Sequence, residues 1–202
     1  MNLKTTTIVI YIVCIGLVLL FIGGVILPDI KEENKLFKTL LIANADWSEV
    51  SLDSQKADSY YIEAGYNYED KMYKSLESNC RLARGYYLET SQGYKKIKST
   101  ITSLEIKDPL IDIYQDMLDS IIEVTNNMYE ACEHFESTAR YYDTYYNMNV
   151  PYGAYDDTSY DMGTAELELH NEKIREHDRA VEEYNQLLSD YKVELEMRLD
   201  SS

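Results

Sequence analysis

The chain has 202 residues and a formal net charge of −17 at pH 7, because 36 acidic residues stand against 19 basic ones. Nucleic acid and anionic lipid head groups repel a chain of this charge, so we exclude nucleic acid as a partner. Cationic surfaces, metal ions and other proteins stay open as partners. The simpler alternative is that the charge only keeps the chain soluble.

The first residues of the chain predict a membrane anchor. After a short tail, residues 1–7, the segment 8–27 carries no charged side chain. As a helix rising ~1.5 Å per residue, it would span about 30 Å, the thickness of a bilayer core. We therefore expect one transmembrane helix over residues 8–28, with Pro28 at its end.

A cleaved signal peptide is the main alternative for this segment. Signal peptides carry a shorter apolar stretch of roughly 7–15 residues, followed by small residues at the cleavage site. Here the run is longer and ends in Val25, Ile26 and Leu27, which are bulky. The pattern therefore favours an uncleaved signal anchor in a single-pass membrane protein.

Residues 29–52 are the predicted juxtamembrane segment, and residues 53–202 form an acidic helical bundle. Apolar residues in the first segment indicate a short leading helix within 31–47 that includes Trp47. This helix leads from the bilayer or packs at the base of the bundle.

The prolines mark boundaries in the bundle. Pro109 follows Asp108, an acid that can cap a helix whose first residue is proline, and Pro151 stands in a loop-like stretch. We therefore expect long helices over 53–104, 109–148 and 159–200.

Three seams of mostly apolar residues, with alternating spacings of three and four, support these helices and are typical of coiled-coil packing. The seams consist of Tyr73, Leu76, Cys80, Ala83, Tyr87, Thr90, Tyr94, Ile97, Ile101 and Leu104; of Ile111, Tyr114, Leu118, Ile121, Thr125, Met128, Cys132, Phe135, Ala139, Tyr142 and Tyr146; and of Leu167, His170, Ile174, His177, Val181, Tyr184, Leu188, Tyr191 and Leu195. The predicted fold is all-α: a transmembrane helix, then a long antiparallel three-helix, coiled-coil-like bundle, or a four-helix bundle if the leading helix joins it.

Cys80 and Cys132 lie on the first and second seams and are a candidate disulfide. In an antiparallel hairpin, residues at equal height have a constant sum of positions, and the midpoint of this pair falls in the expected turn near residue 106. A disulfide needs Cα atoms about 5–6 Å apart, and it would place the bundle in an oxidising compartment. Two small buried side chains that align without a bond are the alternative.

The lysines beside the anchor favour the opposite orientation. Lys31, Lys35 and Lys38 follow the anchor, whereas only Lys4 precedes it, which by the positive-inside rule places the bundle in the cytoplasm. We give the cysteines more weight and expect a plasma-membrane protein with an extracytoplasmic C-terminal domain.

His170 and His177 stand seven residues apart on the third seam and are a candidate pH-sensitive pair. The ordinary interpretation is that they hydrogen-bond to tyrosine or acid at the seam edge. A zinc site of Cys80, Cys132 and His177, with His134 nearby, is a weaker alternative, because none of the local zinc spacings occurs. We expect no metal and no cofactor.

The chain contains 20 tyrosines but only three phenylalanines. Where two tyrosines adjoin on a helix, one of them is expected to flank the core. Tyr60, Tyr86, Tyr141 and Tyr145 are therefore a candidate contact surface for another protein or for a second copy of the chain. Alternatively, tyrosines fill a wide seam and their hydroxyls reach water.

No motif for nucleotide binding, hydrolysis, an EF-hand or a di-iron centre occurs in the sequence, and we expect no enzyme. We hypothesise a membrane-anchored, non-enzymatic helical bundle that mediates protein contacts or acts as a spacer at the membrane surface. The alternative is an extracytoplasmic ligand-binding or sensory domain that works with a partner subunit.

Overall fold

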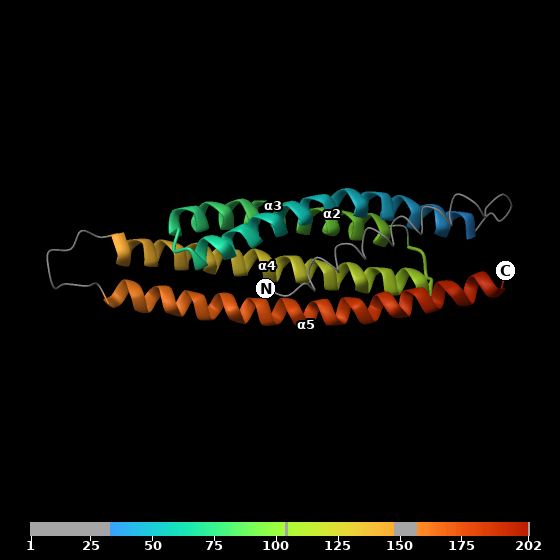
Figure 1. Cartoon of the computed structure of the whole chain (residues 1–202). Coiled ribbons are helices and arrows are strands. Elements are labelled where there is room, and N and C mark those ends of the chain that lie inside the picture. Colours follow the sequence, from blue (N-terminus) through green and yellow to red (C-terminus); the bar gives the residue numbers. More distant parts are fainter. Residues whose placement is uncertain (1–32, 104, 148–156, 202) are drawn as a thin grey trace. The chain divides into compact units, whose positions relative to one another are not determined.

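The computed structural model describes residues 33–103, 105–147 and 157–201. Within these ranges the chain forms helices and no strand, so the all-α class is confirmed. The helices are α2 (Glu33–Glu69), α3 (Tyr73–Thr102), α4 (Pro109–Asn147) and α5 (Asp157–Ser201) (Figure 1). The predicted anchor, residues 8–28, lies outside the described residues. None of the described helices is both long enough and apolar enough to cross a bilayer.

The expected single helix over 53–104 is wrong, because the structure divides it at residues 70–72. Lys71 has a φ of 59°, and the amides of Lys71 and Met72 donate to the carbonyls of Tyr68 and Asn67. The turn contains neither glycine nor proline, the residues that usually signal such a break. The leading helix is correspondingly longer than expected, since α2 begins at Glu33 and continues to this turn.

The start of α4 follows the prediction. Asp108 caps the helix, because its Oδ1 accepts a hydrogen bond of 2.9 Å from the amide of Leu110. Arg198 of α5 also donates to both carboxylate oxygens of Asp108, at 2.7 and 2.9 Å. These charge-assisted bonds keep the pKa of Asp108 below its ordinary value, although partial burial opposes them.

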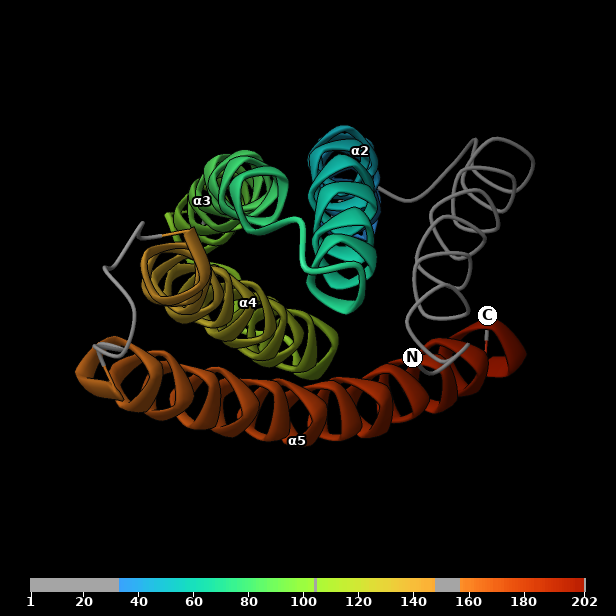
Figure 2. The ribbon, with the colours of Figure 1, turned by 60° about the vertical axis from the view of Figure 1, so that its left-hand side comes forward.

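The described residues divide into two compact units. Unit 1 holds those of 33–55, 89–122 and 183–201, and unit 2 holds those of 56–88 and 123–182. Each helix contributes residues to both units. Within each unit α5 lies beside α4 (Figure 2), as the ring contact of Tyr114 with Tyr191 shows in unit 1 and the bond of His170 to Ala131 shows in unit 2.

The core of unit 1 is centred on Trp47, the only tryptophan of the chain. Its ring centroid lies 5.0 Å from that of Tyr94, 5.6 Å from Tyr114 and 6.2 Å from Tyr184. Each of the four helices therefore supplies one ring to this cluster. Aromatic pairs at such distances stabilise a core beyond the effect of area burial alone.

The core of unit 2 combines small residues with aromatic ones. Its buried members are Ala57, Ala64, Tyr73, Leu76, Cys80, Ala83, Tyr87, Met128, Cys132, Phe135, Ala139 and Tyr142. Small side chains permit close approach of neighbouring helices, and the rings fill the space between them.

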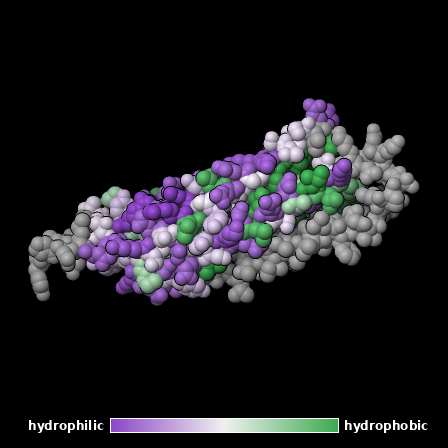
Figure 3. Space-filling model, turned by 90° about the horizontal axis from the view of Figure 1, so that it is seen from above, coloured by the Kyte–Doolittle hydropathy of each residue, from purple (hydrophilic) through white to green (hydrophobic). Residues whose placement is uncertain are grey.

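The predicted seams are confirmed with one exception. All members of the first seam from Tyr73 to Ile101 are buried, while Leu104 lies outside the described residues. On the second seam the prediction of a buried residue is wrong only at Tyr146, because half of its surface is exposed. The third seam is buried or half-buried throughout. The face drawn in Figure 3 is accordingly largely hydrophilic, with groups of hydrophobic residues between.

Candidate functional site

The most distinctive surface feature of unit 2 is a group of tyrosines where α2 ends, α3 begins, α4 ends and α5 begins. We call it the tyrosine cluster; its members are Tyr68, Tyr73, Tyr142, Tyr145, Tyr146 and Tyr160. Tyrosine supplies a large, rigid contact area at low cost in conformational entropy, which is why binding surfaces use it often.

The rings of the cluster touch one another in a continuous chain. Tyr73 stacks on Tyr146 with centroids 5.6 Å apart and planes at 10°, and Tyr142 stacks on Tyr160 at 5.6 Å. Tyr145 joins these two pairs, since it meets Tyr146 edge to face at 4.8 Å and Tyr160 at 5.2 Å. The contacts hold each ring in a defined orientation.

The cluster has a buried side and an exposed side. Tyr73 and Tyr142 are buried, whereas Tyr146 is 50% exposed and Tyr160 is 43% exposed. Met72 and Met162, each next to or close to a cluster member in sequence, are also exposed. Burial raises the pKa of Tyr73 to about 12.

Gly163 allows α5 to approach the buried side of the cluster. A Cβ at this position would lie 2.6 Å from both Cδ1 and Cε1 of Tyr142, closer than side-chain atoms tolerate. The hydroxyl of Tyr142 lies 3.2 Å from Oγ1 of Thr164, the residue next to this glycine. Helix α5 is therefore fitted closely to the ring of Tyr142.

An aspartate stands three residues before each of the two exposed tyrosines of the cluster, a spacing that was not identified from the sequence. Asp143-Thr-Tyr-Tyr146 ends α4 and Asp157-Thr-Ser-Tyr160 begins α5, so each exposed tyrosine has an aspartate three residues earlier. On a helix this spacing puts both side chains on one face. The repeated Asp-Thr-x-Tyr pattern on either side of the expected loop was the available signal.

The four tyrosines predicted as a contact surface occupy different surroundings. Tyr60 and Tyr86 are half-buried and stack on each other at 5.8 Å, with the ammonium of Lys56 5.3 Å from the Tyr86 ring centroid. Tyr141 is half-buried, and its Cβ lies against Gly163. Tyr145 belongs to the tyrosine cluster. Whether any of them contacts a partner stays a prediction.

Cys80 and Cys132 lie in the same core cluster of unit 2, both as free thiols. Burial raises the pKa of both thiols well above the ordinary value, and a negative charge on Cys80 would raise the pKa of Cys132 further. Protonated, buried thiols are poor nucleophiles, which argues against covalent catalysis here. The disulfide itself stays a prediction.

His170 is buried and makes two hydrogen bonds. Its Nδ1 donates to the carbonyl of Ala131 at 2.9 Å, so Nε2 is the acceptor for the hydroxyl of Tyr61 at 3.2 Å. The ring also stacks on Phe135 at 4.4 Å. Burial lowers the pKa of His170, and a positive charge on His134 would lower it further. These contacts suit the neutral ring.

His177 is also buried, but its hydrogen bond is separate from those of His170. Its Nδ1 lies 3.3 Å from Oδ1 of Asp178, and burial lowers its pKa although the aspartate opposes the shift. His134 pairs with Glu166 at 2.7 Å. Among the residues that the structure describes, no group of three or more histidine, cysteine or acidic residues is placed to hold a metal ion.

A buried carboxylate ties α3 to α4 in unit 2. Glu136 is 1% exposed, and three arginines surround it. Arg84 Nη1 lies 3.2 Å from Oε2, Arg81 Nη2 lies 3.4 Å from Oε1, and Arg140 pairs with Oε1 as well. The three guanidinium groups offset the cost of burying this charge.

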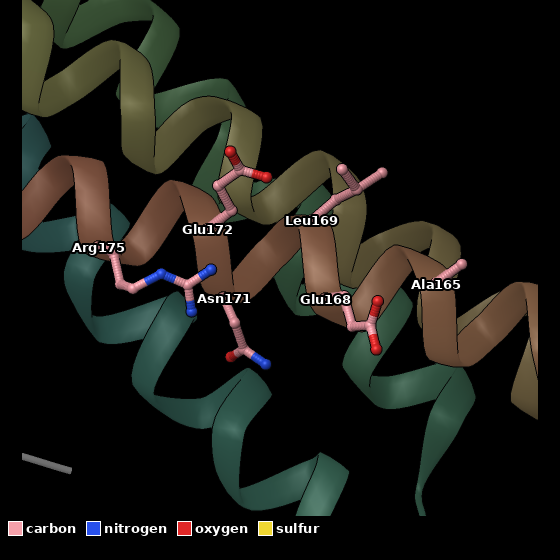
Figure 4. Close-up of a pocket in the computed structure, with 6 residues that line it drawn as sticks. All are labelled: Ala165, Glu168, Leu169, Asn171, Glu172 and Arg175. Atoms are coloured by element: carbon pink, nitrogen blue, oxygen red, sulfur yellow. The ribbon is translucent and has the colours of Figure 1, made fainter.

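Helix α5 also carries a hollow of about 510 Å³. Its lining residues are Ala165, Glu168, Leu169, Asn171, Glu172 and Arg175 (Figure 4). All six belong to α5, and Figure 4 shows Leu169 and Glu172 pointing away from Asn171 and Arg175. Ligand sites usually enclose the ligand with convergent polar groups, which these six residues do not provide.

No protein-family model, no curated protein and no solved structure matches this chain.

Proposed function

We propose that the chain is a membrane-anchored, non-enzymatic helical bundle that binds another protein through the tyrosine cluster of unit 2. The observation that carries the proposal is the exposure of Tyr146 and Tyr160, two rings that are held in place by neighbouring tyrosines. Exposure of large apolar side chains to water is unfavourable, so a partner that covers them gains binding free energy. Rings that are already ordered lose little entropy when the partner binds.

Site-specific photocrosslinking in the native membrane tests this proposal. A photoreactive phenylalanine derivative at position 146 should form an adduct of one defined mass. The matched control is position 52, because Leu52 is 54% exposed but belongs to unit 1. An adduct of twice the mass of the chain would identify a second copy as the partner. Equal crosslinking from both positions, or none from either, would contradict the proposal and leave the spacer function.

The anchor is the second part of the proposal, and its support is the uncharged segment 8–27. The full chain should stay in the membrane fraction after alkaline extraction, whereas a chain lacking residues 8–28 should be released. Release of the full chain would contradict the anchor.

The orientation of the bundle and the state of the cysteines are tested together. We propose that the bundle is extracytoplasmic and that Cys80 and Cys132 form a disulfide there. Such a bond closes a loop of about 50 residues and stabilises the fold by roughly 4 kcal/mol. The third cysteine of the chain, Cys14, stands in the predicted anchor and is replaced so that it is not counted. Thiol counting on this Cys14→Ser chain, with alkylating agent present during lysis, should find no free thiol. Two free thiols would contradict the disulfide and remove the main argument for this orientation.

A further inference from the structure

We infer that the tyrosine cluster binds the cationic side chains, lysine or arginine, of a protein partner. This inference rests on the proposed function, because it names the chemistry of the partner that the same surface would bind. It follows from the rings and the carboxylates that share the surface, and from a lysine of the chain that already occupies part of it.

A cation can approach the exposed rings, although another tyrosine is stacked on one face of each. The face of an aromatic ring carries negative electrostatic potential and attracts an ammonium or guanidinium group within about 6 Å of its centroid. Tyr146 and Tyr160 are the two exposed rings of the cluster, and Tyr145 contacts both of them. A cationic side chain that approaches this surface therefore meets several rings of fixed orientation.

A lysine of the chain itself shows that this surface accepts a cation. The ammonium of Lys71 lies 5.9 Å from the ring centroid of Tyr146. Lys71 stands in the turn between α2 and α3 with a left-handed backbone, and its side chain is exposed. An exposed lysine could extend into water instead, so its position over the ring indicates an attraction that a partner's lysine would also feel.

Carboxylates flank the rings on both helices. Asp143 precedes Tyr146 by one helical turn on α4, and Asp157 precedes Tyr160 by one turn on α5. Among the other exposed acids, Asp161 follows Tyr160 and Glu69 follows Tyr68, while Asp70 stands in the turn between α2 and α3. An anionic partner would be repelled here, and an apolar partner would have to desolvate these charges.

The net charge of −17 adds long-range attraction for a basic protein. General attraction alone would bind any cation anywhere on the surface, whereas the inference predicts binding that depends on the tyrosine cluster. Experiments must therefore separate local charge from total charge.

The test uses the full chain in non-ionic detergent and two labelled peptides of equal length, alternating lysine with glycine or glutamate with glycine. Fluorescence anisotropy should show binding of the lysine peptide, about tenfold weaker at about 300 mM salt than at about 50 mM. The glutamate peptide should not bind. Equal binding of both peptides, or binding that salt does not weaken, would overturn the inference.

Paired variants separate local charge from total charge. Asp143→Asn with Asp157→Asn should weaken binding of the lysine peptide about tenfold. The control, Asp116→Asn with Glu123→Gln, removes the same charge from exposed positions outside the cluster and should weaken it less than about twofold. If both pairs weaken binding equally, the attraction comes from the net charge and the inference is wrong.

Ring variants test the aromatic contribution. Tyr146→Ser with Tyr160→Ser should weaken binding about fivefold, whereas Tyr146→Phe with Tyr160→Phe should retain it, because phenylalanine keeps the ring face. Far-UV circular dichroism checks that each variant is folded, and the phenylalanine pair provides a second reading if the serine pair is not. Loss of binding in the phenylalanine pair would overturn the ring-face inference.

These outcomes are distinct from those of the crosslinking experiment. A defined adduct from position 146, without binding of the lysine peptide, would refute the cationic partner and leave the proposed function standing. Binding of the peptide without any adduct in membranes would count against the proposed function alone. An adduct of two copies of this acidic chain would also argue against a cationic partner.

Discussion

Unit 1 and unit 2 draw on the same four helices but fill their cores in different ways. Unit 1 places one aromatic ring from each helix around Trp47. Unit 2 combines small residues and aromatic rings with both core cysteines and with buried ionisable groups. Among the described residues, the buried carboxylate Glu136 and the buried histidines His170 and His177 all belong to unit 2.

This difference shows how one set of helices can combine two physical behaviours. An aromatic core stabilises by burying apolar area and is insensitive to pH. A core with buried ionisable groups depends on pH and on exact pairing, because an unpaired buried charge is costly. We therefore expect changes in pH above about 4 to act mainly on unit 2, because the lowered pKa of Asp108 in unit 1 affects stability only in stronger acid. Four predictions test this contrast.

The largest effect is expected from Tyr114→Ala in unit 1. The ring is fully buried, contacts Trp47 and Tyr191, and donates a hydrogen bond of 3.2 Å to Asn44. Its removal should lower the free energy of unfolding by about 3–5 kcal/mol. Urea unfolding followed by Trp47 fluorescence measures this in unit 1, with exposed Tyr66→Ala as a control that should change little.

The same experiment asks whether the units unfold together. In a Cys14→Ser chain under reducing conditions, alkylation of Cys80 and Cys132 reports on unit 2. We expect both probes to shift together, because each helix contributes to both units. Thiols that stay protected after the fluorescence transition would show that the units unfold separately.

The second effect concerns Glu136 in unit 2. Glu136→Gln keeps the shape but removes the charge that pairs with Arg81, Arg84 and Arg140. Because the site is buried and its partners are partly exposed, we expect a loss of about 1–3 kcal/mol in urea unfolding. Glu123→Gln changes an exposed glutamate of the same helix and should have almost no effect. Equal stabilities of the two variants would contradict a structural role for the buried carboxylate.

Three glycine-to-alanine variants compare close helix contacts in the two units. In unit 1 a Cβ at Gly93 would lie 2.5 Å from Cγ2 of Val50, and in unit 2 a Cβ at Gly163 would lie 2.6 Å from the ring of Tyr142. Both variants should lose about 1–3 kcal/mol by overpacking. Gly85, which has no atom within 4 Å of its would-be Cβ, should gain about 0.5–1 kcal/mol instead. Thermal unfolding measures all three, and a stabilised Gly163→Ala chain would show that the fit around Tyr142 is loose.

The smallest effect is expected from pH. Burial lowers the pKa of His170 and His177 from the ordinary value of 6.5, so the unfolded chain binds these protons first as pH falls below 6.5. Stability should then fall, by up to about 1.4 kcal/mol per pH unit for each histidine, until the folded-state pKa is reached. His170→Gln should flatten this part of the profile of unfolding free energy against pH.

Asp58 has the opposite effect on the pH dependence of stability. Burial raises its pKa to about 6, although the hydroxyl of Tyr87, which donates to it at 2.6 Å, opposes the shift. The folded chain therefore binds this proton first, and stability is gained as pH falls from about 6 towards the ordinary value of 3.8. Asp58→Asn should remove this gain and make the acid-induced loss steeper. An unchanged profile in both variants would show that these buried groups do not control the pH dependence.

The sequence by itself determined the features that depend on near neighbours along the chain. Heptad spacing located the buried faces of α3, α4 and α5, because apolar residues that recur every three to four positions lie on one face of a helix, and that face is buried. Asp108 and Pro109 located the start of α4, since capping involves only the first turn. Cys80 and Cys132 were placed in one core by counting heights along a hairpin, which needs only a short turn between two helices.

Only the tertiary structure decided the rest. The break at residues 70–72 is made by backbone hydrogen bonds and one left-handed residue, Lys71, and these have no compositional signature. Heptad spacing placed Tyr146 in the core, but the ring lies at the end of α4, where the seam reaches the surface. Which tyrosines meet, and which arginines reach Glu136, depends on which helices are neighbours. Such contacts join residues far apart in the chain, so the local spacing of residues does not predict them.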